Sequence, residues 1–266
     1  MSKRKTVRDI RKLYEDGTPI TMVTCYDFTF AKLVESADIE AVLVGDSLGN
    51  VVQGETTTLP VTIEDIIYHT RAVVRGNGSA HVIADMPFMS YQADTAEGVR
   101  NAGRLLKEGG AQAVKMEGGA SIAPTMRRIV EAGIPVVGHL GLTPQSVHKF
   151  GGYRVQGRGD EARTRLLEDA RAVEEAGAYC LVLEMVPEGV AAEISDTIDI
   201  PTVGIGAGAE TNGQVLVIYD LLGLDTSFTP TFLKRYASLE STIVEALSEY
   251  RDEVRDGEFP DDEHTF

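Results

Sequence analysis

Five apolar runs in this sequence each end in an ionisable residue, and this repeated pattern constrains the fold more than any other feature. The stretch EAVLVGDSLG ends its run at Asp46, and four later runs end at Asp85, Glu117, His139 and Glu184. A short apolar run with glycine or an acid at its exit is typical of a strand buried on both faces. In a barrel of parallel strands all carboxyl ends meet at one rim, so we expect the five groups to converge there.

Strand and helix patterns alternate along the whole chain. Strands are predicted over 20–25, 41–46, 81–84, 112–116, 135–137, 179–183, 202–205 and 215–218, and helices over 6–15, 27–36, 63–75, 95–108, 121–131, 161–176 and 231–251. The recurring segments EGGAQAVKME, EAGIPVVGH and EAGAYCLVLE indicate a repeated helix and strand unit. The prediction is one α/β domain over residues 1–266, a (β/α)₈ TIM barrel with a short N-terminal helix and an acidic C-terminal tail. An open doubly wound sheet is the alternative, although the glycine-rich first turn of a dinucleotide-binding unit is absent.

Composition limits the classes of partner. The chain has 266 residues, 43% of them hydrophobic, which is enough for a substantial core, and its net charge is −16. Nucleic acids and anionic membranes need a basic footprint, so neither is expected as a partner. We find no apolar run of membrane-spanning length and no signal-peptide core, which predicts a cytoplasmic protein. Cys25 and Cys180 lie in strand-like contexts and are expected to be buried free thiols.

Three of the five terminal groups suggest a metal site. Asp46, Asp85 and Glu117 end the second, third and fourth predicted strands, which are neighbours around the rim. Three carboxylates brought close together repel one another, so either some are protonated or a cation lies between them. Oxygen ligands favour a hard ion, and Mg²⁺ is the ion we expect. The alternative is three separately solvated or salt-bridged acids.

Lys115 and His139 have several possible roles. Lys115 lies two residues before Glu117, and strand alternation therefore places both on the same face. An inward lysine can be an anion clamp, an internal ion-pair partner or a Schiff-base nucleophile, and beside a metal site we favour the clamp. His139 is either a hydrogen-bonded structural residue or part of the functional rim.

The later strands carry a candidate base and a candidate binding loop. Glu184 follows three apolar residues, and a partly desolvated carboxylate is suited to act as a general base near neutral pH. A buried acid paired with an arginine is the alternative for Glu184. The sequence GIGAG, Gly204 to Gly208, either approaches a phosphate or other ligand closely or forms a tight turn. Residues 140–160 form a long connection on the rim, interpreted as a lid or a subunit contact.

Several long segments resemble the ketopantoate hydroxymethyltransferase family. They are TCYDFTFAKL, LVGDSLGNVVQG, TLPVTIEDIIYHT, ADMPFMSY, VKMEGG, GHLGLTPQSVHKFGGYRVQGRG, LVLEMVP and GIGAG, spread over residues 24–208. The resemblance implies a barrel of the phosphoenolpyruvate/pyruvate superfamily. It also implies transfer of a hydroxymethyl group from 5,10-methylenetetrahydrofolate, or a related pterin, to 3-methyl-2-oxobutanoate through a Mg-stabilised enolate. The products would be 2-dehydropantoate and tetrahydrofolate, on the route to pantothenate and coenzyme A, and members form homo-oligomers, often decamers.

The same resemblance assigns roles to individual residues. It implies magnesium ligands at Asp46, Asp85 and Glu117, ketoacid contacts at Asp46, Ser47, Asp85, Lys115 and His139, and a proton acceptor at Glu184. Three other functions stay open on the residues alone. They are a Mg-dependent carbon–carbon or carbon–phosphorus lyase acting on a 2-oxoacid, a Schiff-base aldolase using Lys115, and a ligand-binding barrel without catalysis.

Overall fold

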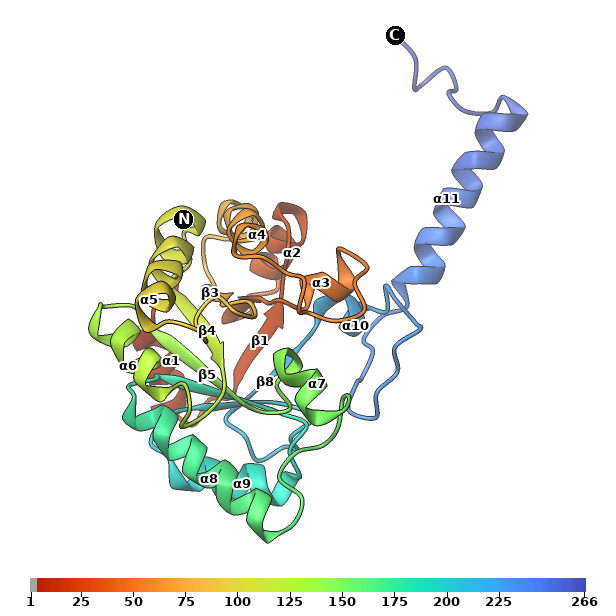
Figure 1. Ribbon diagram of the computed structural model, residues 1–266. Helices are drawn as coiled ribbons and strands as arrows, with labels where there is room; N and C mark the ends of the chain where they lie inside the picture. Colours follow the sequence, from red (N-terminus) through yellow and green to blue (C-terminus); the bar gives the residue numbers. More distant parts are fainter. Residues whose placement is uncertain (1–3) are drawn as a thin grey trace. The chain divides into compact units, whose positions relative to one another are not determined.

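Residues 4–266 of the chain are described by a computed structural model (Figure 1). They divide after Val217 into two compact units, each of which is described here by itself. The first unit contains all the predicted site residues. The sequence-based assignment of a single domain to residues 1–266 stays a prediction.

Eight parallel strands close into a barrel in the first unit (Figure 1). Their bounds are β1 Ile20–Thr24, β2 Ala41–Val44, β3 His81–Asp85, β4 Ala113–Glu117, β5 Val136–Gly141, β6 Cys180–Glu184, β7 Thr202–Ile205 and β8 Gly213–Leu216. The strands follow one another in chain order, and β1 pairs with both β2 and β8. This arrangement confirms the predicted (β/α)₈ barrel, and the open doubly wound sheet is wrong.

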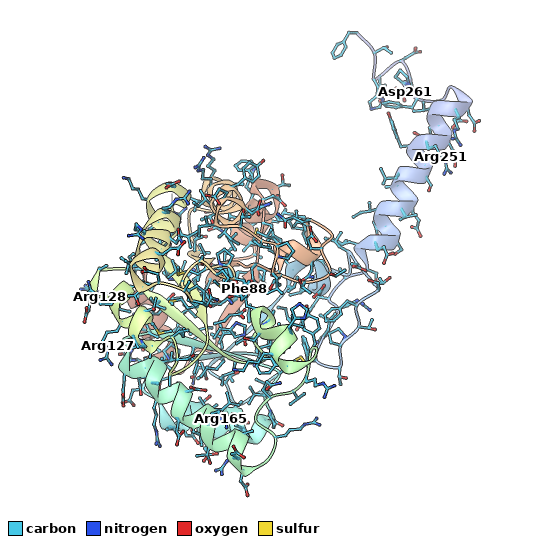
Figure 2. All side chains as sticks on the ribbon, in the orientation of Figure 1. Phe88, Arg127, Arg128, Arg165, Arg251 and Asp261 are labelled. Atoms are coloured by element: carbon cyan, nitrogen blue, oxygen red, sulfur yellow. The ribbon has the colours of Figure 1, made fainter. Side chains whose placement is uncertain are left out.

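The helices of the first unit include one before β1 and those that connect each strand to the next from β1 to β7, whereas β7 passes to β8 without a helix. They are α1 Val7–Glu15, α2 Phe28–Ser36, α3 Leu48–Val51, α4 Ile63–Gly76, α5 Thr95–Arg104, α6 Ala123–Glu131, α7 Val147–Phe150, α8 Asp160–Glu175 and α9 Glu188–Thr197, with a π-helix η1 Leu105–Gly109 and a 3₁₀ helix η2 Pro144–Ser146. Charged side chains such as Arg128 on α6 and Arg165 on α8 extend away from the barrel and are 61% and 70% exposed (Figure 2). Apolar residues of the same helices, Ile129 and Leu166 among them, are buried. This division into a polar and an apolar face is what holds an amphipathic helix against a sheet.

Local signals explain where two of these helices begin. The Asp27 side chain accepts a hydrogen bond of 2.9 Å from the backbone N–H of Phe30, which caps α2. Thr62 and Asp65 form a capping box at the start of α4. Each cap satisfies backbone N–H groups that the helix itself leaves unpaired.

The barrel interior is filled by residues from alternate positions of the strands. One core cluster contains Ile20, Met22, Ala41, Leu43, Ile83, Ala113, Val137, Cys180, Val182, Val203 and Val215. Ile10 of α1 belongs to the same cluster, so the predicted N-terminal helix is formed and packs onto the barrel core. Cys25 and Cys180 are buried free thiols, as predicted.

Some element bounds differ from the sequence prediction. The second strand ends at Val44 rather than Asp46, and β5 continues to Gly141 beyond the predicted end at Val137. The predicted helix over 95–108 changes to a π-helix at Leu105, which ends before Gly110 in a left-handed conformation. Helix α9 was not predicted at all, although Val190, Ala191 and Ile194 have helical spacing.

The second unit contains α10 Ile218–Leu222 and α11 Leu239–Asp256. The predicted helix over 231–251 is therefore wrong at its start, because residues 231–238 are not helical. The backbone N–H of Tyr236 donates to the carbonyl of Leu221 in α10, so it is not part of a helical turn of its own segment. Ser238 then has the extended φ of −130° of a residue just before a helix.

Candidate active site

Strand alternation aims five side chains into one mouth of the barrel. Residues of the core cluster face inward, and side chains two positions apart share a face. Five residues each lie two or four positions beyond an inward-facing core residue of the same strand: Asp85 on β3, Lys115 and Glu117 on β4, His139 on β5 and Glu184 on β6. The register sets Asp85 opposite Lys115 and Glu117 opposite His139. Sequence positions far apart are thereby brought together.

Lys115 lies at the centre of this group. Its Nζ is 3.1 Å from Asp85 Oδ2 and 3.7 Å from Glu117 Oε1, and it lies 3.0 Å from His139 Nδ1. The four side chains are only 1–4% exposed. Of the roles considered for Lys115, the internal ion pair is the one formed here. Burial alone would lower the pKa of Lys115, but Asp85 and Glu117 outweigh it and raise that pKa above its usual range.

The protonation of Lys115 bears on the Schiff-base alternative. An amine must lose its proton to attack a carbonyl carbon, since an ammonium has no lone pair. The raised pKa of Lys115 keeps the proton on Nζ, which disfavours this chemistry and favours a role as a fixed positive charge.

His139 connects Lys115 to Glu184. An ammonium group only donates hydrogen bonds, so in this arrangement Nδ1 of His139 accepts from Lys115 and the ring proton is on Nε2. Nε2 lies 3.2 Å from Glu184 Oε2, and the Glu184 side chain is 18% exposed. The partner of Glu184 is thus a histidine rather than the arginine considered as an alternative.

Asp46 and Ser47 enter the site from the loop after β2. The backbone N–H of Asp46 donates to Asp85 Oδ2 over 3.1 Å. Ser47 lies at the start of α3, and its hydroxyl is 2.8 Å from the Tyr26 hydroxyl. Burial and the charges of Asp85 and Glu117 raise the pKa of Asp46 well above its usual value.

The mouth holds more negative than positive charge. Against the carboxyl groups of Asp46, Asp85 and Glu117, the ammonium of Lys115 is one positive charge. Burial raises the pKa of Asp85 as well, in opposition to Lys115. Excess negative charge in a buried site is relieved either by a proton or by a bound cation.

Two residues that the sequence did not single out tie these groups together. The backbone N–H of Gln145 donates to Glu117 Oε2 over 3.0 Å, and its side-chain Nε2 donates to Asp46 Oδ2 over 2.9 Å. The Tyr91 hydroxyl accepts from the backbone N–H of Glu117 over 2.9 Å. Both residues are on loops that follow strands, where no periodicity marks them. The only sequence signal that could have indicated Gln145 is that it is a polar residue next to Pro144 of η2.

The long connection after β5 reaches the same region. The backbone N–H of Gln156 donates to the carbonyl of Met185, directly after β6. Tyr153 is 51% exposed, and burial followed by the charges of Glu184, Asp46 and Glu117 raises the pKa of Tyr153. The interpretation of this segment as a lid or subunit contact stays a prediction.

The GIGAG segment forms a turn against α9. Gly206 and Gly208 have φ values of +63° and +83°, and a Cβ on Gly208 would be 2.4 Å from Glu188 Cγ. These values give a physical reason for glycine at Gly208, because a side chain there would clash. The tight turn is formed, and its contact with a ligand stays a prediction.

The donor set was compared with the needs of Mg²⁺. Within residues 4–266, no group of three or more His, Cys, Asp or Glu side chains is arranged to hold a metal ion directly. Asp85 Oδ1 and Glu117 Oε1 are, however, buried oxygens that find no hydrogen-bond partner in that range. Mg²⁺ usually keeps several waters and uses one or two carboxylates plus substrate oxygens. Two carboxylate oxygens beside Asp46 that accept no hydrogen bond within the described residues fit this mode of binding, and the ligand assignment stays a prediction.

The closed barrel and the charged groups in its mouth are those of a (β/α)₈-barrel enzyme. Among solved structures, this chain is similar to 2,3-dimethylmalate lyase, a PEP mutase/isocitrate lyase superfamily member. The TM-score is 0.62 and the identity 19%, over 97% of this chain and 91% of that one. Phosphonopyruvate hydrolase in complex with oxalate and Mg²⁺ gives a TM-score of 0.63 at 13% identity, over 98% and 93%. At these identities the likeness shows the fold alone.

The sequence comparisons specify the family. The chain belongs to the ketopantoate hydroxymethyltransferase family, whose model matches residues 4–262. It is 54% identical to 3-methyl-2-oxobutanoate hydroxymethyltransferase of Syntrophotalea carbinolica over 266 residues, which is 100% of both chains. The identity to the enzyme of that name from Moorella thermoacetica is also 54%, over 99% of this chain and 98% of that one. The predicted family and the prediction of a transferase are confirmed.

Helix length and apolar character were compared with the requirements of a membrane-spanning helix. In the part of the chain that the structure describes, no helix combines the length and the apolar character needed to cross a membrane.

Proposed function

We propose that the protein transfers a hydroxymethyl group from 5,10-methylenetetrahydrofolate, or a related pterin, to C3 of 3-methyl-2-oxobutanoate. The products are 2-dehydropantoate and tetrahydrofolate, which puts the reaction on the route to pantothenate and coenzyme A. The observation that carries the proposal is the row of Lys115, His139 and Glu184, spaced 3.0 and 3.2 Å apart in the mouth of a barrel from this family. A cation, an imidazole and a partly exposed carboxylate are the groups that enolate formation from a 2-oxoacid needs.

Glu184 acts as the general base. Its carboxylate takes the proton from C3, and the electron pair of the broken C–H bond moves toward the keto oxygen to give an enolate. Its side chain is 18% exposed, so the proton that it takes can pass on to solvent. The Nε2 of His139 lies 3.2 Å from one of its carboxylate oxygens.

Lys115 and His139 stabilise the charge that develops on the substrate. Lys115 keeps its proton and is held by Asp85 and Glu117, so it needs no reorganisation when negative charge appears nearby. Ser47 and Asp46 lie at the start of α3 and contact the ketoacid from the β2 side. The enolate carbon then attacks the methylene carbon of the donor. The two C–N bonds of that methylene carbon break and its two nitrogens each take up a proton, one in place of the proton removed from C3 and one from water. The remaining hydroxide of that water becomes the hydroxyl group of the product.

Asp46, Asp85 and Glu117 would hold Mg²⁺. When bound, the ion polarises the keto and carboxylate oxygens of the substrate and so makes the C3 proton more acidic. This part of the proposal is supported by the excess negative charge of the three acids and by the unpartnered oxygens of Asp85 and Glu117. A further support is that phosphonopyruvate hydrolase, a solved barrel of similar fold, forms a complex with oxalate and Mg²⁺.

We also propose a cytoplasmic homo-oligomer, with the decamer of the family as the first candidate. Buried free thiols at Cys25 and Cys180 support a reducing compartment. Support for the oligomer comes from α11, which has no buried residue. Its apolar side chains are 42–63% exposed and share one face by helical spacing: Ile243, Leu247, Tyr250 and Val254. The mass in solution, measured by light scattering, tests this assembly.

Proton exchange at C3 tests the assigned base. We expect Glu184→Gln to fold and to bind 3-methyl-2-oxobutanoate, but to lose exchange of the C3 proton in D₂O by about 10²-fold or more, followed by NMR with Mg²⁺ and without folate. Glu161→Gln is the control, because Glu161 is exposed and pairs with Arg165 on the outside of α8. Unimpaired exchange in Glu184→Gln would assign the base to another group.

A requirement for the donor separates the remaining alternatives. A carbon–carbon or carbon–phosphorus lyase on the same barrel would cleave its 2-oxoacid without folate. Formation of 2-dehydropantoate only when the methylene donor is present supports the transferase. Turnover of a 2-oxoacid without donor would favour the lyase.

A further inference from the structure

Gln145 forms hydrogen bonds to the carboxylates of both Asp46 and Glu117. It is 5% exposed and lies in η2, on the loop that follows β5. Its backbone N–H donates to Glu117 Oε2, while its side-chain Nε2 donates to Asp46 Oδ2 at 2.9 Å and to the carbonyl of Met86 at 3.0 Å. One residue thus joins the exits of β2, β3 and β4 to the loop after β5.

The neighbours of the Gln145 amide fix its orientation. Both hydrogens of Nε2 are used, by Asp46 and by the Met86 carbonyl. The oxygen Oε1 accepts from Gln92 Nε2 at 2.9 Å and lies 3.1 Å from the Tyr91 hydroxyl. If the amide were turned over, its oxygen would face two acceptors and its NH₂ would face another NH₂. A single orientation therefore satisfies the buried amide.

This arrangement divides the oxygens of Glu117 between two tasks. Oε2 is bound by the backbone of Gln145, and Oε1 is left without a hydrogen-bond partner among residues 4–266. Asp46 is similarly held by one oxygen, Oδ2. Carboxylates that are fixed by one oxygen can present the other in a constant direction.

We propose that Gln145 is a positioning residue that sets the orientation of Asp46 relative to Glu117 and thereby the affinity of the site for a divalent cation. The inference rests on the proposed function, because it needs the carboxylates to bind an ion. Partners that orient metal-binding carboxylates typically change metal affinity by 10–100-fold when they are removed. The interior of the barrel leaves Asp46 little room to find another donor, since it is 4% exposed.

Gln145→Met tests the side-chain contact in the full-length protein. Methionine has a similar length and retains the backbone N–H that binds Glu117, so the substitution keeps that bond and removes the side-chain hydrogen bonds, the one to Asp46 among them. Gln112→Met is the matched control. Gln112 also has both amide atoms bonded, to the Lys5 carbonyl and the Val82 N–H, but at the opposite end of the strands from the site. This control shows the effect of losing a buried amide on stability while the site residues are unchanged.

The measurement is Mn²⁺ affinity by calorimetry in the absence of ketoacid and folate. We expect Gln145→Met to bind Mn²⁺ at least about 10-fold more weakly than wild type, and Gln112→Met to bind it as wild type does. Excess Mn²⁺ should then restore C3 exchange in Gln145→Met, which a general loss of structure would not allow. Gln145→Asn withdraws the amide from Asp46 and should weaken binding in the same way, which provides a second variant if the first folds poorly.

The outcomes separate the inference from the function on which it rests. Unchanged Mn²⁺ affinity in a folded Gln145 variant, with tight binding by wild type, would overturn the positioning role and leave the proposed function intact. Absence of divalent-ion binding by the wild-type protein would overturn the proposed metal chemistry and the inference with it.

Discussion

Replacement of Lys115 by methionine should destabilise the protein strongly, because it removes the positive charge from a buried acidic cluster. Lys115 Nζ contacts Asp85 Oδ2 at 3.1 Å and Glu117 Oε1 at 3.7 Å, and its side chain is 4% exposed. Methionine matches the length of lysine, so the packing volume is nearly kept while the charge is lost. What remains is an uncompensated group of buried carboxylates.

The size of the effect follows from the burial of the pair. Removal of one partner of a buried ion pair costs about 3–5 kcal/mol, since the other charge is left without compensation. For a domain of this size, 1 kcal/mol corresponds to roughly 2–4 °C in Tm. We therefore expect the Tm of Lys115→Met to fall by about 6–20 °C. Lys107→Met is the control, because Lys107 is exposed on η1 and its replacement should change stability by less than about 0.5 kcal/mol.

The loss should also depend on pH. The carboxyl groups of Asp46 and Asp85 already have pKa values raised by burial, and removal of the Lys115 ammonium raises them further. A carboxyl whose pKa is higher in the folded than in the unfolded state stabilises the fold at low pH. This stability is lost as the pH rises through the folded pKa. The deficit of Lys115→Met relative to wild type should thus be larger at pH 8 than at pH 5.

Thermal unfolding followed by circular dichroism, at one scan rate and in EDTA, measures both effects. EDTA removes divalent ions, which could otherwise replace the missing charge. A Tm for Lys115→Met within about 2 °C of wild type at pH 8 would refute the reasoning. So would a deficit that is the same at pH 5 and pH 8, because it would mean that the carboxyl groups do not sense the ammonium.

Two further predictions concern the backbone of the site and the other end of the strands. Gly141→Ala should cost about 2–5 kcal/mol and should disturb C3 exchange, because Gly141 has a φ of +91° and an added Cβ would be 2.2 Å from the carbonyl oxygen of Glu184. Gly133→Ala, with a φ of +86° and open space, should cost only about 1–2 kcal/mol in the same denaturant titration. Burial lowers the pKa of His81 to about 4. The unfolded state therefore binds the proton more readily, and Tm should fall as the pH decreases from 6.5 toward 4. His81→Gln, which can still bond to Tyr179, should flatten this slope, and an unchanged slope would contradict it.

The sequence predicted the fold because its local signals agree with one another. The caps at Asp27 and Thr62 and the apolar strands all indicate the same alternation of helix and strand. Strand alternation also predicted that Lys115 and Glu117 share a face, and the core position of Ala113 on the same strand makes this face the inward one. The predicted helix over 231–251 was wrong for residues 231–238. The backbone N–H of Tyr236 donates to the carbonyl of Leu221 there, and no local pattern reveals this contact.

The details of the site depend on information that the sequence does not contain locally. That Lys115 lies opposite Asp85 follows from the register between β3 and β4, which the closure of the barrel determines. The role of Gln145 depends on the path of an irregular loop, where neither a period of two nor one of 3.6 applies. The sequence allowed residues on strands to be assigned to the site. It did not allow this for loop residues such as Gln145, which hold the strand residues in place.

Burial separates the site into two parts with different tasks. The side chains of Asp85, Lys115, Glu117 and His139 are 1–4% exposed, whereas Glu184 is 18% exposed. Deeply buried charges keep a fixed geometry, which suits them to bind and orient, while a base that turns over must exchange its proton with solvent. His139, within 3.2 Å of both Lys115 and Glu184, joins the two parts. Substitutions in the deep part should therefore change the binding of ion and ketoacid together, whereas substitution of Glu184 should change proton exchange with little effect on binding.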